Sequence, residues 1–274
     1  MEKTIEDVIL QHSGRGMELL RPSLPPDFCR RAARALLDRP KGVVLLTTGF
    51  YVGGHAETDG PAGTMVAARA LRRLGYRPIL VTDAYCKGFF DEDPLETVYM
   101  RPEDGDGYCR ALLARFRPVA LLSIERCGKN TAGDYANMRG VSIRPYTAPI
   151  DRLFELAQGS VLTIGVGDGG NEIGMGALAE EIGRKLPLVP CRVAADALII
   201  ATVSNWGAYG LAAALAEASG QDVLCAPEQV EAFLRRTVAL GSVDGVSGRN
   251  IACVDGFPLE TELSILAELR AYLK

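Results

Sequence analysis

The sequence predicts an α/β fold with a mainly parallel, doubly wound sheet and helices on both faces, an α/β/α sandwich. Short runs of apolar and β-branched residues, typical of strands that are buried on both faces, alternate along the chain with helical patterns. The composition is that of a globular protein with a large core, since 48% of the 274 residues are hydrophobic and 23% are charged. We expect a single domain over residues 1–274.

The expected strands are continuously apolar and do not alternate with polar residues. They are residues 42–48, 78–82, 119–124, 161–166, 197–203 and 251–254. Helical patterns follow most of these strands, and several end at glycine, which is common just beyond a helix C-terminus. These patterns cover residues 61–74, 108–116, 150–157, 173–185, 206–218, 227–240 and 259–273. Residues 1–25 are expected to form an N-terminal helix and an irregular lead-in.

Charge and cysteine usage exclude several classes of protein. The net charge is −4 without a basic cluster, which argues against a nucleic-acid partner. The start of the chain lacks the pattern of a secretory signal, and no run reaches the ~18 apolar residues of a membrane span, so we expect a cytoplasmic protein. Seven scattered cysteines form no CxxC pair, which argues against a disulfide framework or a zinc-thiolate site. The expected partner is a small molecule, and a homo-oligomer is left open.

Polar loops follow four of the expected strands. They cover residues 47–60, 123–126, 165–172 and 204–207. Because the carboxyl ends of parallel strands meet at one edge of the sheet, and ligands in such sheets bind beyond that edge, we expect these loops to form the site.

The segment 165–170 reads GVGDGG and matches G-x-G-x-x-G, the fingerprint of a dinucleotide site. Asp168 lies inside this loop and Glu172 stands at the start of the expected helix. Two carboxylates therefore occupy the place where a pyrophosphate needs backbone N–H groups and a positive helix end. Asp196 precedes a strand, whereas the acid that binds the ribose of a dinucleotide follows one. We expect no nucleotide cofactor.

The same carboxylates suit a hard divalent cation, Mg²⁺, Mn²⁺ or Ca²⁺, which prefers oxygen ligands. Glu57 and Asp59 stand two residues apart in an extended loop, so their side chains point the same way. With Asp168 and Glu172 they can supply three or four oxygens. Structural roles stay open, because Asp59 can cap the helix that begins at Pro61, Glu172 can complement a helix dipole, and Asp168 can cap a turn.

Other polar residues on these loops can contact a substrate. Glu125 and Arg126 form either a buried ion pair or an acid–base group beside an anion clamp. Residues 133–140 pack donors and acceptors into an irregular stretch, which is typical of binding loops. There, Arg139 can hold a carboxylate through paired N–H donors, as Arg126 can.

Five segments taken together resemble the D-glutamate cyclase C-terminal domain family, and they occur in the family's order. They are ETDGP at 57–61, SIER at 123–126, NMRG at 137–140, GDGGNEIGMG at 167–176 and SNWG at 204–207. The resemblance spans roughly residues 42–257, and its longest segment, 167–176, is the most specific. The chain is identified as a stand-alone member, since the animal enzyme carries a second, N-terminal domain.

The resemblance implies a lyase that converts D-glutamate into 5-oxo-D-proline and water. The α-amine of the substrate then attacks its own γ-carboxylate, which a cation held by Glu57, Asp59, Asp168 and Glu172 activates as a Lewis acid. Glu125 is expected to transfer the protons, and Asp168 is counted with it as catalytic. The expected substrate-binding residues are Arg126, Asn137, Arg139, Asn171, Ser204 and Asn205.

Several alternatives stay open. Acidic loops around a metal ion serve a phosphatase or another hydrolase of small metabolites equally well. A non-catalytic module that binds an amino acid or a dicarboxylate is a third reading. Ser204 and Asn205 can also be an ordinary helix cap, with Trp206 packed into the core.

Overall fold

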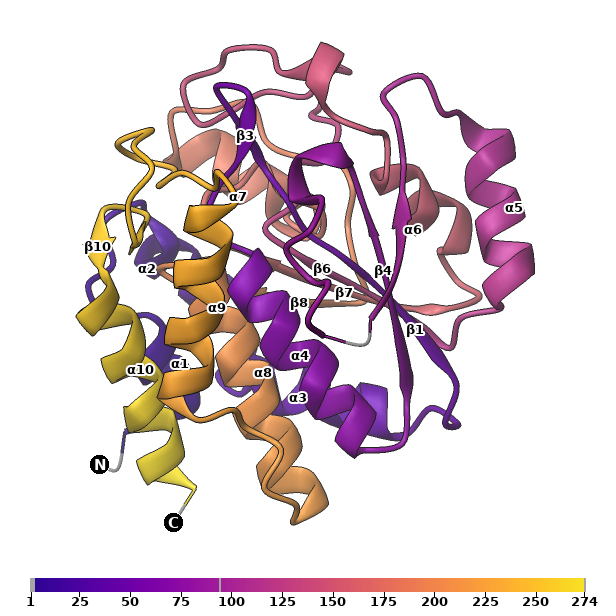
Figure 1. The fold of residues 1–274 in the computed structure, drawn as a ribbon. Coiled ribbons are helices and arrows are strands. Elements are labelled where there is room, and N and C mark those ends of the chain that lie inside the picture. The colour runs from indigo at the N-terminus through magenta and orange to yellow at the C-terminus, as the bar shows by residue number, and fades with distance from the viewer. Residues whose placement is uncertain (1–2, 94, 274) are drawn as a thin grey trace.

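Six parallel strands form the central sheet of the structure, a computed structural model that describes residues 3–93 and 95–273 (Figure 1). Their order across the sheet is β5-β4-β1-β6-β7-β8. Their bounds are β1 Val43–Thr47, β4 Arg77–Thr82, β5 Glu96–Tyr99, β6 Ala120–Ile124, β7 Leu162–Gly167 and β8 Ala197–Ile200. The direction in which successive strands are added reverses between β1 and β6. At such a point the loops that follow the two strands diverge and leave a crevice for a ligand.

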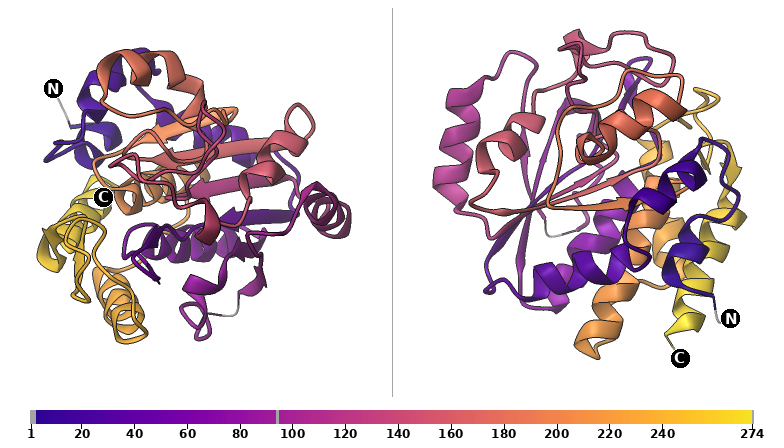
Figure 2. Two further views of the ribbon diagram at one scale, coloured as in Figure 1. Left: turned by 90° about the horizontal axis from the view of Figure 1, so that it is seen from above. Right: turned by 180° about the vertical axis from the view of Figure 1, so that it is seen from behind.

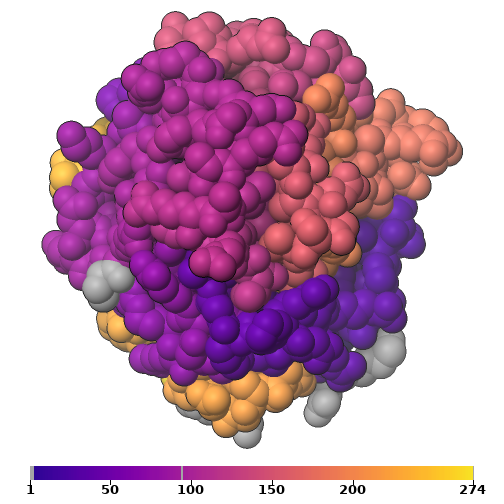
Figure 3. Space-filling view, turned by 90° about the vertical axis from the view of Figure 1, so that its right-hand side faces the viewer, coloured from indigo at the N-terminus to yellow at the C-terminus, as the bar shows by residue number. Residues whose placement is uncertain are grey.

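Helices cover both faces of the sheet, which confirms the predicted α/β sandwich (Figures 1 and 2). One face carries α1 Ile5–Ile9, α3 Phe28–Leu37, α4 Pro61–Arg73, α8 Ser204–Ser219, α9 Pro227–Ala239 and α10 Leu259–Tyr272. The other face carries α5 Asp106–Phe116 and α6 Asp151–Ala157. Figure 3 shows that second side as a continuous surface, with the loop of residues 125–150 at its top. Among the described residues, no helix is long and apolar enough to cross a membrane.

Helix α8 is the central helix of the larger layer, and its sequence explains its place. It is rich in alanine and glycine and buried from Ser204 to Ala216, so that it packs closely between α3 and α4. A Cβ on Gly63 of α4 would lie 2.8 Å from the Cβ of Ala208, closer than packed carbons approach, so only glycine fits at this crossing. Trp206 is fully buried, as predicted by the alternative in which its side chain packs into the core.

The N-terminal region differs from the prediction. Residues 1–25 were expected to be a helix and an irregular lead-in, but α1, α2 (Met17–Leu20) and a 3₁₀ turn (Arg21–Ser23) belong to the packed structure. The side chains of Ile5 and Ile9 are buried against α8 and α10. The amphipathic helix α3 was not predicted, and it supplies Phe28 and Leu36 to the core.

The prediction of one helix over residues 173–185 was wrong in its first half. Gly174 has a φ of +105°, and its N–H donates to the carbonyl of Val193, so this stretch pairs with a neighbouring segment. A 3₁₀ turn (Gly176–Leu178) and α7 (Ala179–Lys185) follow. The edge strand β5 was not predicted, and the expected strand at 251–254 is only a hairpin outside the main sheet, β9 Cys253–Val254 with β10 Phe257–Pro258.

Candidate functional site

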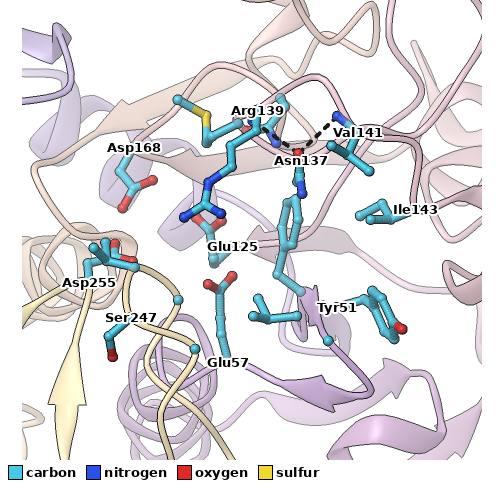
Figure 4. Close-up of a pocket in the computed structure, with 18 of the residues that line it drawn as sticks. Tyr51, Glu57, Glu125, Asn137, Arg139, Val141, Ile143, Asp168, Ser247 and Asp255 are labelled. Atoms are coloured by element: carbon cyan, nitrogen blue, oxygen red, sulfur yellow. Dashed lines mark hydrogen bonds between the residues drawn. The ribbon is translucent and has the colours of Figure 1, made fainter.

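A cavity of about 520 Å³ lies at the carboxyl edge of the sheet, above the point where the strand order reverses. Four acidic side chains line it from different parts of the chain (Figure 4). Glu57 follows the short hairpin of β2 (Tyr51–Val52) and β3 (His55–Ala56), and Glu125 is the first residue after β6. Asp168 is the first residue after β7, and Asp255 lies between β9 and β10. The expected convergence of Glu57 and Asp168 on one pocket is thus observed.

Glu57 has the fewest hydrogen-bond and ion-pair partners of these four acids. Its side chain points into the pocket (Figure 4), and the residue is only 7% exposed. Its carboxylate has no hydrogen-bond or ion-pair partner among the described residues. A Cβ on Gly245 would overlap Oε2 of Glu57, so a larger residue there would displace the end of the Glu57 side chain. Burial, together with the nearby carboxylates of Asp255 and Asp59, raises the pKa of Glu57 well above its ordinary value, so its charged form becomes favourable when a positively charged group binds beside it.

Glu125 is held in an unusual conformation. Its φ of +47° is rare for a residue with a side chain, and such backbone strain is concentrated at functional sites. The Ser204 hydroxyl donates to Oε2 of Glu125 at 2.6 Å, which fixes one oxygen and leaves the other for a ligand. Burial, together with the nearby carboxylates of Glu172 and Glu57, raises the pKa of Glu125 well above its ordinary value. A raised pKa suits a group that takes up and returns protons near neutral pH.

Arg15 supplies a positive charge that the sequence did not predict. Its Nη2 lies 2.7 Å from Oδ2 of Asp168 and 3.3 Å from the carbonyl of Thr202, and it also donates to Asp255. Burial opposes the charged form of Arg15, but Asp168 and Asp255 outweigh it and raise the pKa of the guanidinium. The N-terminal region therefore contributes directly to the site.

Asp59 and Glu172 are buried beside the pocket, but their oxygens accept backbone N–H groups. Asp59 accepts from Ser204 N at 2.9 Å and from Asn205 N at 2.8 Å, so it caps α8 and not the helix that begins at Pro61. Glu172 accepts from the N–H groups of residues 169 and 170, at 2.8 and 2.7 Å. Its suggested role at a helix dipole was wrong, because no helix begins there. The backbone N–H groups of residues 169 and 170, in the glycine-rich segment 165–170, thus point toward Glu172.

Carboxylate oxygens gather in two overlapping groups that can hold a cation. Within each group the ligand atoms of three acids lie within 4.8 Å of one another. The groups, searched over residues 3–93 and 95–273, are Asp59, Asp168 and Asp255, and Glu125, Asp168 and Glu172. Asp168 belongs to both, whereas Glu57 belongs to neither. The donor set therefore fits a hard cation centred on Asp168, with Glu57 facing it from the pocket wall.

Arg126 is placed away from the pocket. Its guanidinium is fully buried and donates to Asp83 at 2.5 Å and to the carbonyls of Gly49 at 2.6 Å and Ala148 at 2.9 Å. It thereby ties together the segments that follow β1, β4 and β6. The buried ion pair foreseen for this position exists, but its partner is Asp83 and not Glu125. The substrate-binding role expected for Arg126 has no support in this geometry.

The other expected substrate contacts divide into two kinds. Asn137, Arg139 and Asn171 line the cavity, and Arg139 points into it from the rim (Figure 4). Asn171 is buried, and its Oδ1 is without a hydrogen-bond partner in the described structure. Ser204 and Asn205 instead lie beneath the pocket: Ser204 holds Glu125, and Oδ1 of Asn205 accepts the N–H groups of residues 60 and 63.

Glu262 of α10 lies behind the site and provides a test of its electrostatics. Trp206 Nε1 and the Tyr209 hydroxyl donate to it at 2.5 and 2.7 Å, and burial raises its pKa from 4.5 to about 7. Because the folded state holds this proton more tightly, its contribution to stability is complete below pH 4.5 and is lost as the pH rises through 7. We expect Glu262→Gln to reduce the fall in unfolding free energy between pH 5 and 8 by about 2 to 3 kcal/mol. Urea denaturation in the presence of a chelator measures this, and equal slopes for the two proteins would contradict it.

Comparison with known proteins places this site in a family. The family model described as D-glutamate cyclase-like, C-terminal, matches residues 5–270, which extends the expected resemblance at both ends. The human protein named "D-glutamate cyclase, mitochondrial" is 34% identical over 198 residues, which cover 63% of this chain and 32% of the human protein. The chain therefore matches about a third of that relative's length.

Among solved structures, an exopolyphosphatase-related protein from Bacteroides fragilis aligns with a TM-score of 0.45 and 8% identity, covering 90% of this chain and 57% of the other. A match with this TM-score and identity supports no inference about the activity of this chain. The family match, in contrast, includes Arg15 and all four acids that line the pocket. The chain belongs to the D-glutamate cyclase-like C-terminal family.

Proposed function

We propose that this chain converts D-glutamate into 5-oxo-D-proline and water in the pocket formed by Glu57, Glu125 and Asp168. The observation that carries the proposal is the buried, partnerless carboxylate of Glu57, which faces the same cavity as Glu125 and Asp168. A substrate ammonium group or a metal ion satisfies such a carboxylate. Membership of the family and the activity in the human relative's name support the choice of reaction.

The substrate is oriented by charge. Its ammonium group is attracted to the acidic half of the pocket, where Glu57 and Glu125 lie. Its α-carboxylate is matched by Arg139 at the rim, which the described structure shows without an ion-pair partner. This arrangement brings the amine next to Glu125 and directs the γ-carboxylate toward Asp168.

Glu125 transfers the protons of ring closure. The amine nitrogen forms a bond with the γ-carboxylate carbon, and one carbon–oxygen bond of that carboxylate breaks. The two protons that the ammonium group loses leave with the departing oxygen as water. The raised pKa of Glu125 suits both uptake and return of a proton, and the Ser204 hydroxyl holds its carboxylate in place for them.

Asp168 would hold a divalent cation, which when bound would act as a Lewis acid on the γ-carboxylate. Asp59 and Asp255 would share it with Asp168, which leaves Glu125 free to transfer protons. Arg15 donates to Oδ2 of Asp168, so it would compete with the cation for that acid.

The proposal is tested by incubating the purified protein with D- or L-glutamate and following 5-oxoproline by mass spectrometry. We expect the D-isomer to be converted. Failure to form 5-oxoproline from either isomer with Mg²⁺ or Mn²⁺ present would contradict the proposal. Release of phosphate from a panel of phosphorylated metabolites would favour a hydrolase instead.

A further inference from the structure

The cavity has a second half that glutamate does not use. Figure 4 shows Tyr51 and Ile143 across the pocket from Asp168 and Asp255. Phe50, Val141 and Tyr146 also line the cavity, so an apolar wall faces the acidic one. Between its charged groups glutamate offers only two methylenes, and it leaves most of this wall without a partner.

Aromatic stacking gives the apolar wall a defined shape. The rings of Tyr51 and Tyr146 are stacked, with centroids 4.3 Å apart and an interplanar angle of 10°. Tyr85 contacts Tyr51 edge-on at 5.0 Å and 65°. The stacked rings therefore present aromatic surface to the cavity, which suits a planar or apolar group.

Part of the cavity lining is both apolar and exposed, although Phe50 and Ile143 of the wall are buried. Among the described residues, eight large hydrophobic side chains are exposed, and three of them line this cavity. They are Val141 at 58%, Tyr146 at 44% and Val246 at 53% exposed. Apolar groups clustered around a pocket that also holds convergent polar groups are typical of a ligand site.

Chemistry decides where an apolar group can be attached to the substrate. If the proposed ring closure occurs here, the α-amine must be free, because it is the nucleophile. The α-carboxylate must also be free, because it is the group that Arg139 matches. Of the three functional groups, only the γ-carbonyl can then carry a substituent, and that substituent becomes the leaving group.

We infer that the wall formed by Phe50, Tyr51, Val141, Ile143 and Tyr146 binds the leaving group of γ-glutamyl amides of aromatic or apolar amines. This inference rests on the proposed function and names its substrate class. The α-amine nitrogen bonds to the γ-carbonyl carbon, and the amide carbon–nitrogen bond breaks. Of the two protons that the ammonium group loses, one goes to the leaving nitrogen and one to solvent. The products are 5-oxo-D-proline and the free amine.

D-γ-glutamyl-benzylamide and D-γ-glutamyl-methylamide test the inference, since both release an alkylamine and differ in the ring. We expect kcat/KM for the benzylamide to be at least about tenfold higher, in the range that apolar pockets give for a small apolar group. Tyr146→Ala is expected to remove this preference without changing turnover of D-glutamate, and Tyr146→Phe to retain it. Tyr108→Ala, at an exposed tyrosine on α5, is the matched control.

The possible failures are distinguishable. Equal kcat/KM for the two amides, or equal losses for both in Tyr146→Ala, overturns the inference, while conversion of D-glutamate still supports the proposed function. Absence of 5-oxoproline from D-glutamate and from both amides overturns the proposed function and the inference together.

Discussion

Glu125→Gln is expected to lower kcat for 5-oxoproline formation by about 10²- to 10⁴-fold, the usual contribution of a positioned acid–base group. Glutamine has the same shape and still accepts a hydrogen bond from Ser204, so the geometry of the pocket is retained. Stability should be equal or higher, because burial among other carboxylates disfavours the ionised form of Glu125, a cost that glutamine does not have. Steady-state kinetics and thermal unfolding of the same preparation measure both effects.

Ser204→Ala is the matched control for Glu125→Gln. It removes the hydrogen bond that positions Glu125 but keeps the carboxylate, so we expect a smaller loss of about tenfold. A kcat for Glu125→Gln within a few-fold of wild type would assign proton transfer to another group, and Glu57, which lines the same pocket, is then the candidate.

Asp168→Asn is expected to abolish the cation-dependent part of turnover, a loss of about 10³-fold or more. A Lewis acid is worth several kcal/mol in such a reaction, and each 1.36 kcal/mol corresponds to a factor of ten in rate. Asp168 is the one acid shared by both oxygen groups, so its replacement weakens either arrangement of ligands. Calorimetric titration with Mn²⁺ should show the matching loss of affinity.

Asp38→Asn provides the comparison for Asp168→Asn, because it makes the same change of charge at an exposed position at the end of α3. It should leave turnover and Mn²⁺ affinity unchanged. Wild-type metal affinity and turnover in Asp168→Asn would place the cation elsewhere or remove it from the mechanism.

The sheet was predictable because its signal is local. Runs such as Val43–Thr47 and Leu162–Gly167 are apolar throughout, as expected for strands covered on both faces. Parallel pairing then brings Glu57, Glu125 and Asp168 to one edge, so their convergence follows from strand order and needs no knowledge of side-chain contacts. The helix expected at 173–185 failed because Gly174 forms a long-range backbone contact that no local pattern reveals.

The residues that were missed act over long distances in the chain. Arg15 and Asp255 are separated by 240 residues, yet they form an ion pair beside Asp168. Asp255 is followed by a glycine, and this pair of residues indicates a turn. No sequence pattern near Arg15 indicates a functional site. Arg126 was misassigned for the same reason, because its partner, Asp83, follows a different strand.

We propose that the acidic side chains of this pocket hold a cation beside a glutamate substrate. The most direct test is to remove bound metal with a chelator, measure 5-oxoproline formation from D-glutamate, and then add back Mg²⁺ or Mn²⁺. We expect turnover to be lost on chelation and to be restored by the metal in wild type but not in Asp168→Asn. Undiminished turnover by the metal-free protein would contradict it.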